Sequence, residues 1–369
     1  MVHLLSAYRI AQGVLILEVR PFEGTPEELS DFIYTQWSAT YRGKMAVPHW
    51  SGDYLHWQLR MSDPAYRRQL IAVYQGTKLA GVFAHFPVEF ELLGERIASS
   101  QQSWLSVAPE FRRQGAAKAL VDGSLAVHRE RGCGFQLGFT YYGRRTSLGP
   151  KFWLKNQMEN STLIRNAGFW VRVLDPAKAA RWNIDRLESW LTWLATPLFP
   201  KLLRRTDSKL VIRPAQSQDI PPCLTLIDRA TRHCQLRIVW DADSLSRQLG
   251  LAGYSHGLIA EIDGEVRGFI TFHLLSMFGR NEAPVGVIDL VAVSELAPDQ
   301  RNELVDAALL ALQELGAVVA LKLRVGDYPR GMFLRLGWTI RPADSHIIIR
   351  WISTPKLQTT LNDIHLLWR

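Results

Sequence analysis

The chain has 369 residues, of which 47% are hydrophobic and 21% are charged, and this balance excludes an intrinsically disordered protein. Its length suggests two domains of ordinary size. The net charge of +8 favours an anionic partner, such as a phosphorylated cofactor, a nucleic acid or an anionic membrane surface.

The cysteines and the apolar segments exclude several other classes. Cys133, Cys223 and Cys234 form neither a disulfide framework nor a cluster with metal-ligand spacing. We therefore expect a reducing, cytoplasmic compartment and no metal site. The first 22 residues lack a basic region and a cleavage site, so we expect no signal peptide. We also expect no transmembrane segment, because no window of about 18 apolar residues exists to span a bilayer.

The first half opens with a strand that ends in Arg-Pro and continues into an amphipathic helix, within residues 17–33. Residues 34–57 are rich in aromatic side chains and include Asp53, with Asp63 nearby; they could pack in a core or hold a sugar, a cationic amine or an acyl tail. The aromatic residues are Trp37, Tyr41, Trp50, Tyr54 and Trp57. Residues 70–86 then form two predicted strands joined by a turn that contains glycine.

The stretch 107–120, VAPEFRRQGAAKAL, joins an apolar strand to an alanine-rich helix. A helix that begins directly after a strand leaves its first N–H groups without partners, and the helix dipole adds partial positive charge there. The small residues 115–117 would let a phosphate approach, and Arg112 and Arg113 add charge. The pattern predicts a phosphate or pyrophosphate site, with an ordinary tight turn as the alternative.

Residues 181–205 separate the two halves and have an apolar stripe followed by basic side chains. The stripe consists of Leu187, Trp190, Leu191 and Leu194. A helix of this kind could lie on a membrane surface. We favour a clamp that buries the stripe between the halves, because a connecting helix must bury its apolar face somewhere.

The second half repeats the order of the first. Residues 210–227 again form a strand ending in Arg-Pro and a helix, and residues 258–274 form a hairpin around Asp263-Gly264. A helix over residues 304–315 and a strand follow. The repeat predicts an α/β (α+β) protein with two tandem domains, each a mixed, mostly antiparallel twisted sheet flanked by helices.

The first-half loop resembles the acyl-CoA signature of the GNAT superfamily of N-acyltransferases, Arg/Gln-x-x-Gly-x-Gly/Ala. The matching residues are Arg112, Arg113, Gln114, Gly115, Ala116 and Ala117. Residues 163–169 and 332–338 resemble the family's closing helix and Gly-aromatic phrase, and residues 211–220 its opening. The resemblance covers most of the chain, because each half carries its own set of matching elements, and it implies a tandem GNAT protein.

In this family the pyrophosphate of coenzyme A lies on the loop and the pantetheine arm pairs along the preceding strand. That strand would be Trp104 to Val107, so the resemblance implies cofactor contacts at Leu105, Ser106 and Val107. It also implies acyl transfer from acetyl-CoA or another acyl-CoA to an amine. The second half has no glycine at its loop and carries Asp299 there, so we expect no acyl-CoA site in it.

The resemblance leaves the proton-transfer groups open. The family's usual tyrosine position holds Ile164 in the first half and Phe333 in the second. Tyr141 and Tyr142 could replace that tyrosine or simply cap the strand end.

The family's usual acid position holds Ser103 in the first half and Asp289 in the second. Glu89 and Glu91 share one face of a strand and could supply a base, although such a pair more often forms the solvated side of a strand. We expect a structural role for His85.

We predict four segments: a GNAT domain with the acyl-CoA site at residues 1–180, a Trp-rich helical linker at 181–208, a degenerate GNAT domain at 209–353, and an extension at 354–369. The leading function is transfer of an acyl group, most simply acetyl, to an amine of a small molecule. Two alternatives remain: a non-catalytic acyl-CoA sensor and a cell-wall-type aminoacyl transferase. We expect no nucleic-acid partner, and peripheral membrane contact stays open.

Overall fold

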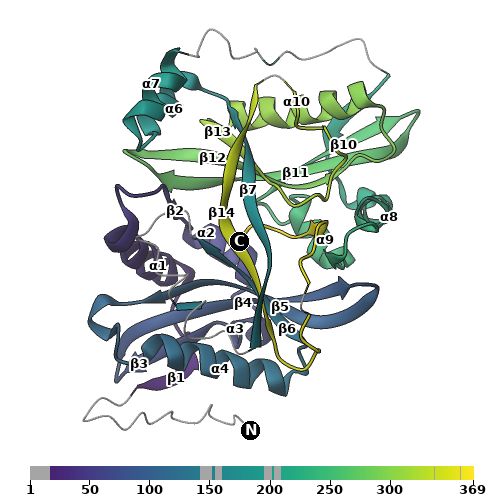
Figure 1. Cartoon of the computed structure of the whole chain (residues 1–369). Coiled ribbons are helices and arrows are strands. Elements are labelled where there is room, and N and C mark those ends of the chain that lie inside the picture. The colour runs from purple at the N-terminus through teal and green to yellow at the C-terminus, as the bar shows by residue number, and fades with distance from the viewer. Residues whose placement is uncertain are drawn as a thin grey trace.

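The structure is a computed structural model, and Figure 1 shows the path of the whole chain. It describes residues 17–141, 152–153, 160–194, 202, 209–335, 337–357 and 359–369, with residues 342–344 described by their backbone alone.

The described strands join into a single 15-stranded sheet, and most neighbouring strands run antiparallel. The strands of the first half are β1 (Glu18–Pro21), β2 (Val47–His49), β3 (Ile71–Gln75), β4 (Lys78–Leu92), β5 (Glu95–Val107), β6 (Phe135–Tyr141) and β7 (Ser161–Val173). Those of the second half are β8 (Val211–Pro214), β9 (Leu236–Ile238), β10 (His256–Ile262), β11 (Glu265–Phe278), β12 (Glu282–Ala292), β13 (Val319–Leu323), β14 (Trp338–Trp351) and β15 (Ile364–His365). This arrangement confirms the predicted α/β fold class.

The two halves exchange their last long strands. The main path through the sheet runs β1-β3-β4-β5-β6-β14-β7-β13-β12-β11-β10-β8. Strand β14 of the second half therefore pairs with β6 of the first, and β7 of the first half pairs with β13 of the second. Strands β7 and β14 also pair with each other, and Figure 1 shows them crossing the middle of the molecule side by side. Each half-sheet is completed by a strand from the other half.

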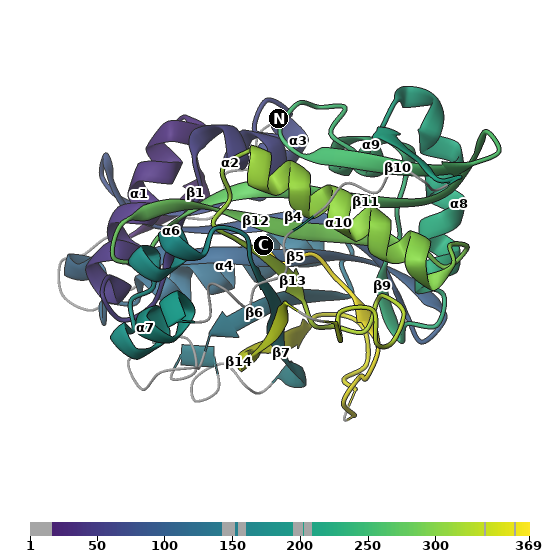
Figure 2. The same cartoon turned by 90° about the horizontal axis from the view of Figure 1, so that it is seen from above.

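Helices cover both faces of the sheet. They are α1 (Pro26–Tyr41), α2 (Gly52–Leu59), α3 (Pro64–Arg67), α4 (Ala116–Glu130), α6 (Pro176–Trp182), α7 (Arg186–Leu194), α8 (Ile220–Thr231), α9 (Ala242–Gln248) and α10 (Pro298–Glu314). Helices α4 and α10 cover the two outer faces, while α1, α2, α8 and α9 lie between the half-sheets (Figures 1 and 2). The equivalent places of α1 and α8, and of α4 and α10, match the sequence repeat.

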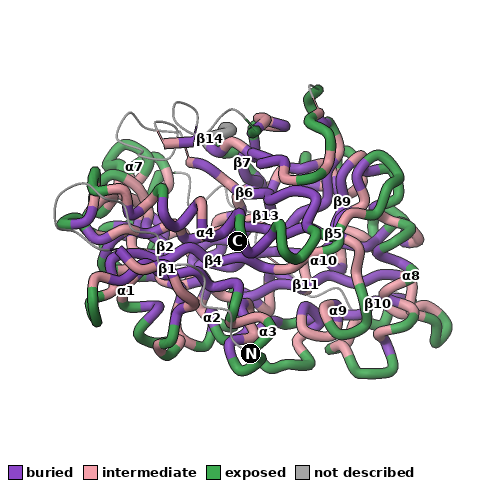
Figure 3. The backbone as a smooth tube through the Cα atoms, turned by 90° about the horizontal axis from the view of Figure 1, so that it is seen from below, coloured by how far each residue is buried: buried purple, intermediate pink, exposed green. Residues whose placement is uncertain are grey.

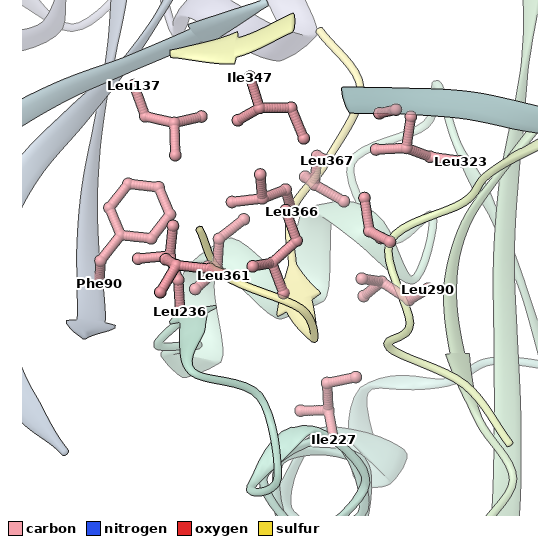
Figure 4. Close-up of a cluster of buried hydrophobic side chains, with 14 of the residues drawn as sticks. Phe90, Leu137, Ile227, Leu236, Leu290, Leu323, Ile347, Leu361, Leu366 and Leu367 are labelled. Carbon is pink, nitrogen blue, oxygen red and sulfur yellow. The ribbon is translucent and has the colours of Figure 1, made fainter. Parts of the chain in front are cut away.

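The largest apolar core lies between the half-sheets and draws on both. Phe90 and Leu137 come from the first half, and Ile227 and Leu290 come from the second (Figure 4). Residues 354–369, expected as an extension, take part in this core. Strand β15 pairs with β9, and apolar side chains next to it, including Leu366, are buried among the core residues. Figure 3 shows the buried backbone running through the centre of the molecule.

Two local expectations are wrong. Residues 163–166 lie inside strand β7, and the described residues of 332–337 lie mostly in turns and bends, so neither closing phrase is a helix. Strand β7 is hydrogen-bonded on both edges, to β13 and to β14, and this pairing overrides the short helical pattern. Ile164 is fully buried there, which accounts for an apolar residue at that position.

The prediction that the helix between the halves acts as a clamp and buries its apolar stripe is also wrong. Helix α7 has no buried residue, and its apolar stripe faces outward. The halves are held together instead by the strand exchange and by the core between the half-sheets.

Candidate active site

The loop before α4 has the geometry of an anion site. Arg113 and Gly115 both adopt left-handed backbone conformations, with φ values of +64° and +86°. Gly115 is the N-cap of α4 and makes no side-chain cap hydrogen bond, so no side chain of that residue covers the start of the helix. The first N–H groups of α4 are therefore available to an anionic group.

The two arginines have different environments. The Arg112 guanidinium donates to the carbonyl oxygen of Val107 at 3.1 Å and to the hydroxyl of Thr40 at 3.0 Å, so it also ties α1 to the end of β5. Arg113 is exposed. Gln114 donates to the carbonyl oxygen of Glu110 at 2.6 Å, and Ala116 is buried against the apolar core below the helix.

Strand β5 separates from β6 beside this loop. The parallel pairing of β5 with β6 covers only Ser100, Gln101 and Gln102 on β5, and β6 then pairs with β14 on its other edge. Residues 103–107 of β5 pair only with β4 in the described sheet, so their other edge is open to a ligand backbone. A β-bulge interrupts the β4–β5 register at Trp104, which has a φ of +56°.

One cavity of about 1110 Å³ connects these features. It begins at Arg112, Arg113, Gly115 and Ala117, and it follows the open edge of β5 at residues 103–107. The candidates Leu105, Ser106 and Val107 all line it, whereas the side chains of Gln114 and Ala116 do not. The structure therefore brings most of the predicted cofactor residues to one wall.

Beyond the bulge the cavity becomes mostly apolar and crosses into the second half. Its far wall consists of Phe169, Val171, Val173, Leu275, Met277, Val319, Leu321 and Trp368. Side chains from α1, from the segment before α2 and from β5 also line the cavity: Trp37 of α1 lies 5.0 Å from Trp50 between ring centroids, and Trp50 lies 5.6 Å from Trp104 of β5. The aromatic stretch 34–57 thus supplies both core packing and the wall of the cavity.

A buried ion network lies behind Tyr54 at this far end. Arg369 reaches into the cavity wall and pairs with Asp289 at 2.8 Å, while His273 binds the same carboxylate through Nδ1 at 2.8 Å. Burial alone would raise the pKa of Asp289, but Arg369 and His273 hold it well below its ordinary value. Burial also raises the pKa of Tyr54, which keeps its hydroxyl protonated. The sequence indicated Asp289 only as the residue at the family's usual acid position, and it offered no signal for its pairing with Arg369 and His273.

The expected carboxylate bases do not lie at the cavity. Glu91 binds Arg237 of β9 through both carboxylate oxygens, at 3.0 and 2.8 Å, and Glu89 pairs with Arg96. The Arg237 guanidinium lowers the pKa of Glu91, so this carboxylate stays ionised in an ion pair. The reason is geometric: this part of β4 is the edge that receives β9. Among the described residues, the acid that lines the cavity is Glu188 of α7.

The remaining candidate residues differ in whether they line the cavity. Tyr141 lines the cavity at the end of β6, whereas Tyr142 lies outside the described residues. Ser103 lines the cavity on the open edge of β5. His85 is buried against α4, where its Nε2 lies 2.8 Å from the hydroxyl of Ser124.

Helix α10, the counterpart of α4, begins differently. Its N-terminus carries Pro298 and Asp299, and the side chain of Gln300 caps the backbone N–H of Ala297 at 3.0 Å. The cavity lining contains no residue of this turn.

Comparisons with known proteins agree with this geometry. A family model for the acetyltransferase (GNAT) domain matches residues 25–145. The fold is similar to that of Saccharomyces cerevisiae N-myristoyltransferase with bound myristoyl-CoA, with 14% identity and a TM-score of 0.70 over 94% of this chain and 85% of that one. It is also similar to a GCN5-related N-acetyltransferase from Kribbella flavida, with 14% identity and a TM-score of 0.53 over 91% and 72% of the two chains. A search of curated protein sequences finds no significant match.

The matched GNAT domain includes α1, the β4–β5 hairpin, the anion loop, α4 and β6, which are the elements that build the loop end of the cavity. The full-length similarity in fold extends over both halves and the exchanged strands. Residues 25–145 therefore match an acetyltransferase (GNAT) domain, and the whole chain shares the fold of N-myristoyltransferase.

Proposed function

We propose that this protein transfers an acyl group longer than acetyl from coenzyme A to an amine. The observation that carries the proposal is one continuous cavity. It runs from the anion loop, past the bulge at Trp104, to an apolar wall built by both halves. A volume of about 1110 Å³ exceeds the roughly 300–1,000 Å³ of ordinary small-molecule sites.

The loop end suits the coenzyme. Its pyrophosphate would bind the N–H groups at the start of α4, with Arg113 as an exposed positive charge beside it. The amide-rich pantetheine arm would pair with the open edge of β5 at residues 103–107, as an added strand does. This arrangement would direct the thioester towards Trp104 and the apolar end of the cavity.

The apolar end suits a long hydrocarbon chain. Burial of each CH₂ group contributes about 0.8 kcal/mol, so a chain of many carbons gains much more there than an acetyl group does. Val319 and Leu321 of β13 and Leu275 of β11 offer such a surface. The acceptor would be an amine, and a small-molecule amine remains our candidate.

The reaction needs a proton acceptor and a proton donor. The amine nitrogen attacks the thioester carbonyl, the C–N bond forms, and the C–S bond breaks to release the thiolate. Glu188 would take the amine proton, directly or through water, because it is the carboxylate on the described cavity wall. Tyr54 and Tyr141 line the cavity, and either hydroxyl could give a proton to the thiolate. A reducing, cytoplasmic location would suit the three unpaired, buried cysteines.

The test is a thiol-release assay with acyl-CoA thioesters from acetyl to myristoyl and a panel of amines. We expect kcat/KM to rise at least tenfold from acetyl-CoA to the best long-chain thioester. Leu321→Trp, which fills the apolar wall, should lower kcat/KM about tenfold for long chains and leave acetyl-CoA turnover unchanged. A preference for acetyl-CoA would contradict the long-chain proposal. Tight binding of acyl-CoA with no release of free coenzyme A would instead support the sensor.

A further inference from the structure

Helix α7 is attached to the protein by its polar face. The Ser189 hydroxyl donates to the carbonyl oxygen of Ala180 in α6 and also accepts from Arg280. Thr192 accepts a hydrogen bond from the Asn183 side chain at 3.2 Å. These contacts lie on one side of the helix because residues three apart share a face. The amphipathic helix is therefore turned with its apolar side outward.

The outward side is an apolar surface, defined here as the α7 face. It consists of Leu187, Trp190, Leu191, Trp193 and Leu194, whose exposed fractions lie between 46% and 63%. Figure 3 shows α7 in the exposed and intermediate colours at the edge of the molecule. Large apolar side chains gathered on one exposed helix mark a surface that another apolar phase covers.

Three observations favour a lipid bilayer as that phase. Tryptophan side chains prefer the interface between lipid and water, and two of them lie on the α7 face. Arg181 and Arg186 are exposed on the same helix pair, and the whole chain carries a net charge of +8. Leu191 and Glu188 of α7 also line the large apolar cavity, so that cavity borders the α7 face. Among the described residues, no helix is long and apolar enough to cross a membrane.

We propose that the α7 face docks the protein on the surface of an anionic lipid bilayer, with the cavity beside the membrane interface. Docking needs no catalysis, so vesicle binding can be tested independently of the proposed acyl transfer. The arrangement would place a cavity for an apolar chain next to the lipid phase that holds such chains.

The experiment is flotation of the full chain with vesicles of phosphatidylcholine alone or with roughly 30% phosphatidylglycerol, which gives the vesicle a negative surface potential. We expect binding to the anionic vesicles that weakens with added salt. The double variant Trp190→Gln/Trp193→Gln should lower the partition coefficient at least tenfold. A matched control, Val211→Gln/Leu315→Gln, removes two exposed apolar side chains elsewhere and should bind like the unmodified protein.

Several outcomes would overturn the proposal. One is the absence of flotation with either vesicle. Another is equal flotation of the tryptophan variant and the control. A third is a self-associated protein that the tryptophan variant turns into a monomer without any vesicle binding, since a second copy would then cover the α7 face. Thiol release in detergent-free buffer, unchanged in the tryptophan variant, would separate a loss of docking from a loss of activity.

Discussion

Gly115 shows how one residue decides the chemistry of the loop. Its φ of +86° is a conformation that glycine adopts without steric cost, and its missing side chain leaves the start of α4 uncovered. A larger residue there would strain the backbone and fill the space where an anion must approach the helix dipole.

We predict that Gly115→Glu abolishes binding of coenzyme A, because it places a negative side chain at the expected position of the pyrophosphate. The control is Gly132→Glu just beyond the other end of α4, where φ is also positive, at +68°, and a side chain would enter open space. Both variants should lose about 1–2 kcal/mol of stability from backbone strain. A thermal-shift titration with coenzyme A should show a ligand-induced shift for the control and none for Gly115→Glu. Equal shifts would exclude the loop as the coenzyme site.

At the scale of elements, α4 and the sheet share a buried polar contact. His128 of α4 and His85 of β4 lie 4.5 Å apart between ring centroids and are nearly inaccessible to solvent. Burial lowers the pKa of His128 to about 4 and that of His85 well below its ordinary value. Both rings are therefore neutral when α4 is docked.

This contact predicts acid-sensitive packing of α4. A histidine whose folded pKa lies below its unfolded value stabilises the fold fully above about pH 6.5, and that contribution falls as the pH drops towards 4. For His128 the expected loss between pH 7.5 and pH 5 is about 2 kcal/mol in the free energy of unfolding. Urea unfolding at the two pH values should show it. The loss in the free energy of unfolding between the two pH values should be smaller in His128→Gln. It should be unchanged in His56→Gln, which alters an exposed histidine. A His128 variant with the full pH dependence would contradict this assignment.

The whole molecule is organised by the strand exchange. Neither half-sheet contains all its strands without the other half, since β14 completes the first and β7 the second. The core between the half-sheets adds residues from both halves and from the segment 361–367 near the end of the chain. Separate unfolding of the halves would break these pairings and expose that core.

We therefore predict one cooperative unfolding transition for the full chain. Tryptophan fluorescence and far-ultraviolet circular dichroism should give coincident melting curves. A chain divided between α7 and β8 should yield two fragments that fail to fold alone and co-purify when expressed together. Two separated transitions, or a monomeric folded fragment, would show that the halves are independent.

Local features were predictable wherever neighbours in sequence decide them. The Asp263-Gly264 turn between β10 and β11, the Arg-Pro strand ends of β1 and β8, and the glycine before α4 all occur as predicted. Each depends on backbone preferences or on a periodicity within about fifteen residues. The order of elements, which recurs in both halves, was enough to indicate the fold, whereas the binding of coenzyme A at the loop before α4 stays a prediction.

The sequence by itself thus indicated the fold class and the repeated order of elements, because these follow from local geometry and order. Only the tertiary structure decided which strands meet, and therefore that the cavity spans both halves. It also placed Asp289 against Arg369, 80 residues away, and turned the stripe of α7 outward while Ser189 faced the protein. Such outcomes depend on long-range pairing and on the competition of every surface for burial, which no short window of sequence contains.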